Sequence, residues 1–175
     1  MQFNESLHLS VDCVLFGYDD NGLKVLLINQ KEDTYAHGNQ QPMSQLPGDL
    51  ILIEEGLDAA AERVLFELTQ VNGVYLKQFH AYGDPNRVSG HKDRTWLRSV
   101  RSMPEQRVVT VGYLGLVSLH DHDPRPASFA GGVRWVDVDE VGPLAFDHND
   151  ILDGAIEALQ NQLESHHISF ELLPK

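Results

Sequence analysis

Residues 46–70 read LPGDLILIEEGLDAAAERVLFELTQ, and this stretch decides the fold. It contains a short apolar run, 50–53, that predicts a strand, and it continues through a loop into a predicted helix over 58–71. Asp58 is a typical N-cap residue, and Gly73 stands where a glycine often ends a helix. The residues expected on the apolar face, by their helical spacing, are Ala60, Val64, Leu68 and Val71. The opposite face carries Arg63, Phe66, Glu67 and Gln70.

Strands and a second helix are predicted around this stretch. Residues 8–18 and 23–29 are apolar-rich, and the Asn21-Gly22 pair between them is typical of a β-hairpin. Strands and helices in mixed order indicate an α/β fold in which helices pack on a sheet. Apolar patterns predict three further strands and a last helix over 74–82, 108–119, 132–138 and 149–164.

The composition is that of a globular domain with a core of its own. The chain has 175 residues, which fits one domain, and 42% of them are apolar. Its one cysteine, Cys13, lies in an apolar run, which favours a core thiol and agrees with a reducing compartment. No apolar run reaches the roughly 18 residues that span a membrane. The first 20 residues carry no Lys or Arg, so they do not resemble a secretory signal, and a cytoplasmic location is expected.

The net charge limits the partners that the chain can take. A formal charge of −13 argues against nucleic-acid binding by this chain, because phosphate binding needs a basic surface. The same charge disfavours anionic ligands unless a metal ion or a local basic patch offsets it. Residues 86–107 are such a patch, with six of the thirteen basic residues. The segment is either a solvated surface insertion or a basic lid for an anionic ligand.

The stretch that opened this section resembles a known motif. Gly48 is followed by five residues and then by Glu54, and seven more residues lead to 62–70. This layout resembles the Nudix box, which runs glycine, five residues, glutamate, seven residues, and then Arg-Glu-apolar-any-Glu-Glu-any-Gly-apolar. The resemblance extends from about residue 8 to the C-terminus. It implies a Nudix-type α/β/α sandwich with a mixed sheet, in which Gly48 and Glu54 are scaffold residues of the motif.

The family resemblance also implies a chemistry. Nudix enzymes cleave a diphosphate bond with water and Mg²⁺ or Mn²⁺, which prefer carboxylate ligands. The three box acids lie at i, i+3 and i+4, on one helix face. In this chain they correspond to Arg63, Phe66 and Glu67, of which only Glu67 is a carboxylate. The other departures from the box are Glu62, Thr69 and Asp49.

The altered motif predicts a domain that binds a small molecule without hydrolysing it. No cofactor is then required, and Mg²⁺ or Mn²⁺, held weakly by Glu67, would be needed only for activity. Three other acids could restore a metal site: Glu55, Asp49 and Glu62. The main alternative is therefore a metal-dependent Nudix pyrophosphohydrolase acting on a nucleoside diphosphate derivative. A third possibility is a dimerisation scaffold without a ligand.

The ligand pocket is predicted between the box helix and residues 82–87. Phe66 would form a wall for a base or sugar, although an exposed Phe can also lack any role. The Arg63–Glu67 pair would contact the ligand, or it is an ordinary surface ion pair at i, i+4. Asp84 and Arg87 would lie at the pocket mouth, or they only stabilise a turn. The candidate ligand contacts are Arg63, Phe66, Glu67, Asp84 and Arg87.

Four further segments resemble one branch of the family. They are Ala81–Arg87, Arg107–Tyr113, Leu144–His148 and Ile168–Pro174. The branch is that of the Nudix-related transcriptional regulators, in which a Nudix sensor precedes a winged helix. Its members respond to ADP-ribose-type nucleotides or to a sugar such as arabinose.

The branch resemblance implies a domain organisation. It implies a small-molecule sensor that forms a homodimer, with a Nudix-like domain over 1–165. Residues 166–175 are then a tail that links to an absent winged helix, through which alone DNA is contacted. Two smaller motifs have structural interpretations. Asp147-His148 is expected as the N-cap region of the last helix, and 120–123 as a polar turn rather than a metal site.

Overall fold

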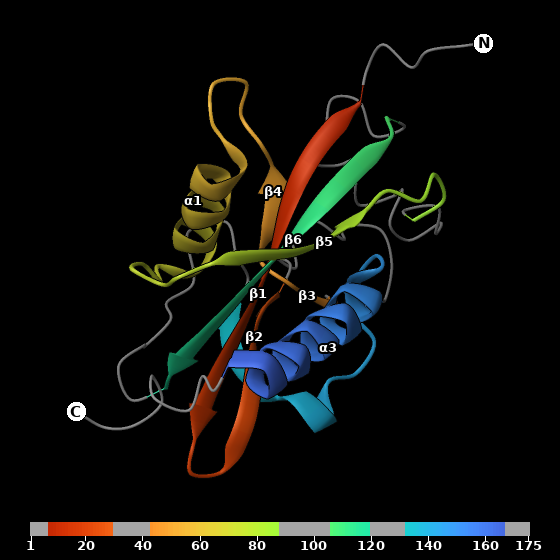
Figure 1. Cartoon of the computed structure of the whole chain (residues 1–175). Helices are drawn as coiled ribbons and strands as arrows, with labels where there is room; N and C mark the ends of the chain where they lie inside the picture. The colour runs from red at the N-terminus through yellow and green to blue at the C-terminus, as the bar shows by residue number, and fades with distance from the viewer. Residues whose placement is uncertain (1–6, 30–42, 88–105, 120–131, 167–175) are drawn as a thin grey trace.

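The computed structural model describes residues 7–29, 43–87, 106–119 and 132–166 (Figure 1). Residues 88–105 of the basic segment, the residues 120–123 that were predicted as a turn, and the residues after 166 lie outside these ranges, so their predicted roles stay predictions. The order of elements is β1 (His8–Asp19), β2 (Gly22–Asn29), β3 (Ser44–Gln45), β4 (Gly48–Leu50), α1 (Leu57–Thr69), β5 (Lys77–Tyr82), β6 (Val108–Ser118), β7 (Gly132–Asp137), the short 3₁₀ helix η2 (Val138–Glu140) and α3 (His148–His166).

The strands form one mixed sheet with β1 at its centre. The strand order is β3-β2-β1-β6-β5, while β4 pairs with β1 and β7 pairs with β2. β1 runs parallel to β6 from His8 to Tyr18, and the other pairings are antiparallel. The pairing of Ser10 with Leu50 and Asp12 with Gly48 brings the loop before α1 to the central strand.

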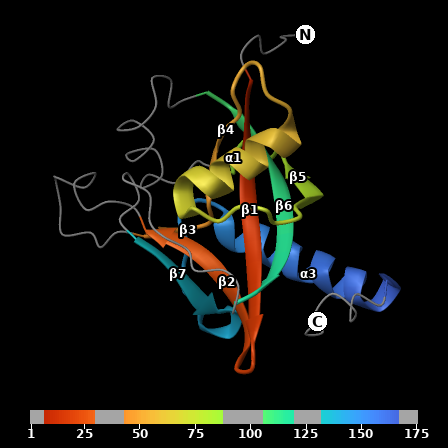
Figure 2. The same cartoon turned by 90° about the vertical axis from the view of Figure 1, so that its left-hand side faces the viewer.

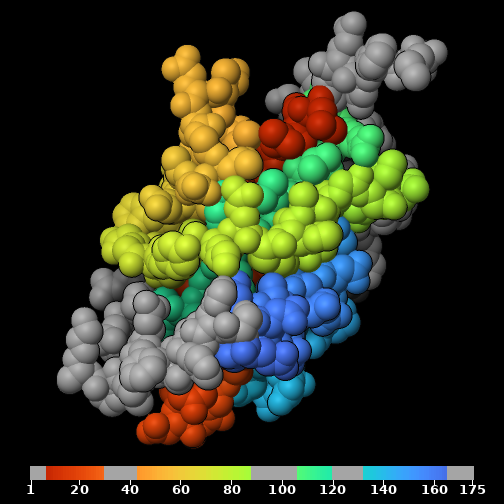
Figure 3. Space-filling view, in the orientation of Figure 1, coloured from red at the N-terminus to blue at the C-terminus, as the bar shows by residue number. Residues whose placement is uncertain are grey.

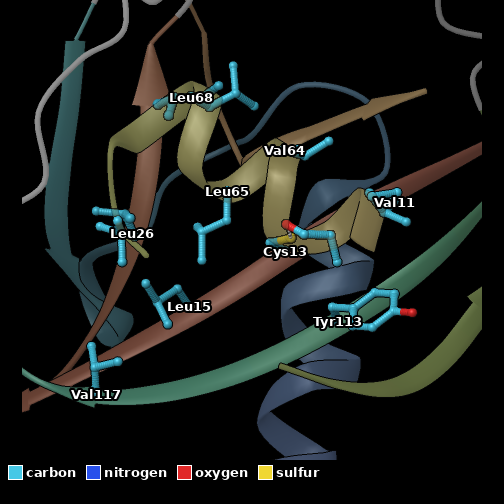
Figure 4. Close-up of a cluster of buried hydrophobic side chains, with 13 residues drawn as sticks. Val11, Cys13, Leu15, Leu26, Val64, Leu65, Leu68, Tyr113 and Val117 are labelled. Atoms are coloured by element: carbon cyan, nitrogen blue, oxygen red, sulfur yellow. Dashed lines mark hydrogen bonds between the residues drawn. The ribbon is translucent and has the colours of Figure 1, made fainter. Parts of the chain in front are cut away.

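One helix covers each face of the sheet, which confirms the α/β/α prediction. Figure 2 shows α1 in front of the sheet and α3 behind it. Successive side chains of a strand point to opposite faces, so β1 serves both cores. Cys13 and Leu15 face α1, in the cluster drawn in Figure 4, whereas Val14 and Phe16 face α3. All four side chains are fully buried. Cys13 is a free buried thiol, as predicted.

The predicted hairpin is confirmed, and several element ends are corrected. The strand predicted over 50–53 was wrong, because β4 spans Gly48–Leu50 and stops where its pairing with β1 ends. Helix α1 begins one residue earlier than predicted, and its N-cap is Gly56. Asp58 is therefore not the N-cap; it lies in the first turn, where a carboxylate interacts favourably with the helix dipole.

The C-terminal end of α1 also differs from the prediction. The helix ends at Thr69, and Gln70 is the C-cap in the left-handed conformation, with φ 61°. Its backbone N–H donates to the Phe66 carbonyl at 2.8 Å. Gly73, predicted to follow the helix end directly, lies three residues beyond this cap. Strand β5 then starts at Lys77, later than expected. In the described part of the chain, no helix is long and apolar enough to cross a membrane.

Candidate functional site

Arg63 hydrogen-bonds to both ends of the loop between β4 and α1, residues 51–56. Its Nε donates to Glu55 Oε2 at 2.9 Å, and its Nη2 donates to Glu55 Oε1 at 2.5 Å. Nη2 also donates to the Leu50 carbonyl at 3.0 Å, and Nη1 donates to Glu67 Oε2 at 3.0 Å. Glu55 in turn accepts from the Leu52 N–H at 2.7 Å. One guanidinium therefore ties the end of β4, the loop and the helix together.

The two ion pairs of Arg63 differ in character. The Arg63 hydrogen bonds lower the pKa of Glu55 from 4.5 to about 2. The Glu55 side chain is 14% exposed, whereas that of Glu67 is 49% exposed. The Arg63–Glu67 contact is thus the surface i, i+4 pair that the sequence offered as one interpretation, and it contributes little on its own. The bidentate Arg63–Glu55 pair is the stronger contact.

The geometry favours a register of the box that lies one residue later than the predicted one. Counted from Asp49 instead of Gly48, the pattern puts Glu55 at the box glutamate and Arg63 at the box arginine, and these two residues are bonded. It puts Gln70 at the box glycine, and Gln70 has the positive φ that favours glycine. Val71 then stands at the last apolar position and is 4% exposed. Glu54, the predicted scaffold glutamate, is exposed.

In this register, too, two of the three helix acids of the box are replaced. The acids at i, i+3 and i+4 now correspond to Val64, Glu67 and Leu68. Val64 is 1% exposed and Leu68 is 7% exposed, and both pack in the α1-side core (Figure 4). Glu67 remains the single carboxylate in either register. Among the described residues, no group of three or more His, Cys, Asp or Glu is placed to hold a metal ion.

Phe66 is the aromatic side chain that α1 exposes next to Glu55, Arg63 and Glu67, which we call the ion-pair group of α1. It is 42% exposed, one turn from Arg63 and adjacent to Glu67. The prediction that it lies off the apolar face is confirmed. A half-exposed ring beside charged groups can stack on a base or sugar face.

Arg87 belongs to a second, buried group. Its Nε and Nη2 donate to the two carboxylate oxygens of Asp147 at 2.8 and 2.7 Å, and its Nη1 donates to Thr110 Oγ1 at 2.9 Å. Its Nη2 lies 3.9 Å from Asp12 Oδ2. The side chains of Arg87, Asp12 and Asp147 are only 7%, 8% and 11% exposed. We name Asp12, Arg87, Thr110, Asp147 and His148 the Arg87 cluster.

His148 and Gly48 complete the cluster. His148 Nδ1 accepts a hydrogen bond from the Leu46 N–H at 2.9 Å, and its Nε2 lies 3.7 Å from Asp12 Oδ1. A Cβ on Gly48 would overlap that same Asp12 oxygen. Glycine is thus required at position 48 by the close approach of Asp12, which gives its predicted scaffold role a physical cause.

The five predicted ligand contacts lie on two parts of the fold. Arg63, Phe66 and Glu67 lie on α1, while Arg87 faces the N-terminal end of α3. In Figure 3 the segment that leads through β5 crosses the surface between α1 and α3. Asp84 is exposed and forms a turn, in which its Oδ1 accepts from the Asn86 N–H at 2.7 Å. The turn interpretation therefore describes the Asp84 contacts, and a ligand role for these residues stays a prediction.

Sequence reasoning found Glu67 as a partner of Arg63 but missed Glu55, and it missed Asp147 as the partner of Arg87. Asp147 precedes α3 directly, as its predicted N-cap position requires, but its carboxylate binds Arg87, which is 60 residues away. No local pattern announces such a pair. Glu55 could have been found, because it precedes Arg63 by the separation that the box prescribes for its glutamate and arginine.

Comparison with known proteins decides the family. The family model described as the NUDIX domain matches residues 6–158. The chain belongs to the Nudix family.

Two relatives bear on the role of this Nudix domain. The ADPR responsive transcriptional repressor NtrR of Acinetobacter baylyi is 27% identical over 170 residues, which cover 95% of this chain and 60% of that protein. The chain therefore spans less than two thirds of the length of this curated relative. The NUDIX domain of Shewanella oneidensis NrtR, solved in complex with ADP ribose, aligns with a TM-score of 0.68 and 29% identity, covering 89% of this chain and 90% of that one.

A further structure shows the fold alone. A MutT/nudix family protein from Enterococcus faecalis aligns with a TM-score of 0.70 at 24% identity, covering 94% of this chain and 66% of that one. The Nudix domain of this chain is thus similar both to a repressor and to MutT-type proteins.

Proposed function

We propose that this chain is the ligand-sensing Nudix domain of a transcriptional regulator, and that it binds an ADP-ribose-type nucleotide without hydrolysing it. The observation that carries the proposal is the replacement of two box carboxylates by Val64 and Leu68, both buried in the core. The similarity to an ADPR responsive repressor and to a Nudix domain complexed with ADP ribose supports the choice of ligand.

Among the residues that the structure describes, metal-assisted hydrolysis has too few ligands near the box. Mg²⁺ and Mn²⁺ need several oxygen ligands to hold a diphosphate and activate water. Glu67 offers one carboxylate, and one of its oxygens already accepts from Arg63 at 3.0 Å. Glu55, considered from the sequence as a replacement ligand, is bonded through both oxygens to Arg63. The other two acids that the sequence offered as replacement ligands, Asp49 and Glu62, are exposed side chains.

Retained ligand binding needs a surface rather than a metal cluster. Phe66 offers a ring face for the base, and its neighbours Arg63 and Glu67 offer polar edges. We place the base of the ligand against Phe66 because it is the exposed aromatic residue of α1.

DNA contact, homodimer formation and a cytoplasmic location are further parts of this proposal. The Shewanella oneidensis NrtR structure with a 27mer DNA is 29% identical, and the match covers 63% of its chain. The charge of −13 disfavours DNA contact by the present residues. We therefore assign DNA contact to a winged-helix domain of the regulator, outside this Nudix domain.

The alternative function is a metal-dependent pyrophosphohydrolase. The observation in its favour is Glu67, which keeps a box carboxylate and is 49% exposed. This alternative predicts cleavage of ADP-ribose that depends on Mg²⁺ or Mn²⁺ and is abolished by Glu67→Gln.

The proposal is tested by calorimetric titration with ADP-ribose, ADP, AMP and free arabinose. We expect saturable binding of ADP-ribose and weaker binding after Phe66→Ala. Tyr18→Ala is the matched control, because Tyr18 is an aromatic side chain, 50% exposed, at the end of the β1–β2 hairpin. Saturable binding to none of the four compounds, or to arabinose alone, would overturn the proposal.

A further inference from the structure

The N-terminal end of α3 is fixed by three separate contacts. The Asp147 carboxylate accepts two hydrogen bonds from Arg87, at 2.8 and 2.7 Å. His148 accepts from the Leu46 N–H at 2.9 Å, and the Ala145 N–H donates to the Ser44 carbonyl at 3.0 Å. The helix end is therefore bonded both to the turn after β5 and to the residues that lead into the box.

The backbone between these contacts is strained. Phe146 has a backbone φ of 57°, which residues other than glycine rarely adopt. Its ring lies against that of His148, with centroids 5.3 Å apart. A residue holds such a conformation only where the surrounding contacts enforce it, and conformational switches often contain one. Here the contacts of Ala145, Asp147 and His148 flank the strained residue on both sides.

The Arg87 cluster also reaches the box itself. Leu46 is two residues before Gly48, and Gly48 admits the Asp12 carboxylate that lies 3.7 Å from His148. Two residues after Gly48, the Leu50 carbonyl accepts a hydrogen bond from Arg63 Nη2 at 3.0 Å. A continuous path of contacts thus leads from the ion-pair group of α1, along β4, to the start of α3.

We propose that the Arg87–Asp147 pair and the His148–Leu46 bond couple the box to α3, so that a displacement of one segment is passed to the other. This inference rests on the proposed function: it supplies the route by which a ligand bound at Phe66 and Glu67 would change the position of α3. Phe146 lies between the residues that make these contacts. If the Arg87–Asp147 pair or the His148–Leu46 bond loosens, its strained backbone can relax.

Native-state hydrogen exchange of the ligand-free protein tests the coupling, with Asp147→Asn as the variant. The Asp147 carboxylate binds Arg87, whereas the Leu46 N–H donates to His148, so an effect on the Leu46 amide is expected to pass through the start of α3. We expect roughly tenfold faster exchange at Leu46 and at Ile151, with β1 amides such as that of Val14 unchanged. Asp137→Asn is the matched control, because it removes the carboxylate of the 2.8 Å pair with Lys24 elsewhere on the sheet.

Two outcomes would overturn the coupling. One is faster exchange at Ile151 with no change at Leu46. The other is an equal change at Leu46, Ile151 and Val14, which is global destabilisation. Phe146→Gly provides a second variant that keeps the Arg87–Asp147 pair; because glycine removes the steric cost of the positive φ, it is expected to slow exchange at Leu46 and Ile151 together, with Val14 unchanged.

A final arm separates this inference from the proposed function. If ADP-ribose binds, it is expected to slow exchange at Leu46 and Ile151 in the wild-type protein, and to slow Leu46 alone in Asp147→Asn. If ADP-ribose does not bind, the proposed function fails, and the ligand-free comparison still decides the coupling.

Discussion

Arg63 binds both carboxylate oxygens of Glu55, at 2.9 and 2.5 Å, across the loop that precedes α1. This pair fixes the register of the box, because its two members stand where the family pattern has its glutamate and arginine. Glu54 follows Gly48 at the spacing that Glu55 has from Asp49. It takes no part in this pair, and its side chain is exposed.

The Glu55–Arg63 pair predicts a pH dependence of stability. Folding lowers the pKa of Glu55 from 4.5 to about 2, mainly through the Arg63 hydrogen bond. The pair therefore stabilises the fold above pH 4.5, and this stability is lost as the pH falls toward 2. Glu55→Gln should lower the free energy of unfolding at pH 7 and differ less from the wild type at low pH, as measured by urea unfolding. Glu54→Gln should match the wild type throughout, and equal behaviour of the two variants would refute the pairing.

The helix end predicts a stabilising substitution. Gln70 has φ 61°, where a glycine avoids the steric cost of a Cβ. Gln70→Gly should raise the free energy of unfolding by about 1 kcal/mol. Gln160→Gly, at an exposed position in the middle of α3, should instead lower it by about 1 kcal/mol. Thermal unfolding monitored by circular dichroism measures both, and a lower Tm for Gln70→Gly would contradict the assigned cap.

The close approach of Asp12 predicts that Gly48 is irreplaceable. A Cβ at position 48 would overlap Asp12 Oδ1, so Gly48→Ala should cost about 1–3 kcal/mol of stability. Gly56→Ala is the control, because no atom lies within 4 Å of a Cβ there. Urea unfolding of the two variants is the measurement. Similar stabilities for both would mean that the Asp12 carboxylate does not occupy the position described.

The buried thiol predicts resistance to labelling. Burial, assisted by the nearby Asp12 charge, raises the pKa of Cys13, and its Sγ donates to the Ala61 carbonyl at 3.5 Å. The thiolate is the reactive form, so iodoacetamide should leave the native protein unmodified and should modify it fully in denaturant. Mass spectrometry counts the adducts. Rapid labelling of the native protein would place Cys13 outside the core.

Much of the fold was predictable because its pattern is local. The alternation of β1 and β2 and the Asn21-Gly22 turn specify a hairpin from residues that are close in sequence. The length of β4 was not predictable, because it is set by the pairing of Ser10 and Asp12 with residues almost forty positions later.

The candidate site was predictable in outline, but its register could not be chosen from spacing alone. Gly48 and Glu54 have the spacing of the box, and so do Asp49 and Glu55, one residue later. The Glu55–Arg63 bond and the left-handed Gln70 favour the later register, and the sequence pattern contains neither. The Arg87 cluster was missed because its members come from four separate segments of the chain.

The proposed loss of hydrolysis is tested most directly by incubating the protein with ADP-ribose and Mg²⁺ or Mn²⁺ and analysing the nucleotide by chromatography. We expect ADP-ribose to be recovered intact at protein concentrations that saturate binding, because only Glu67 is left of the three metal-binding acids of the box helix. Metal-dependent release of AMP and ribose 5-phosphate, abolished by Glu67→Gln, would contradict the account.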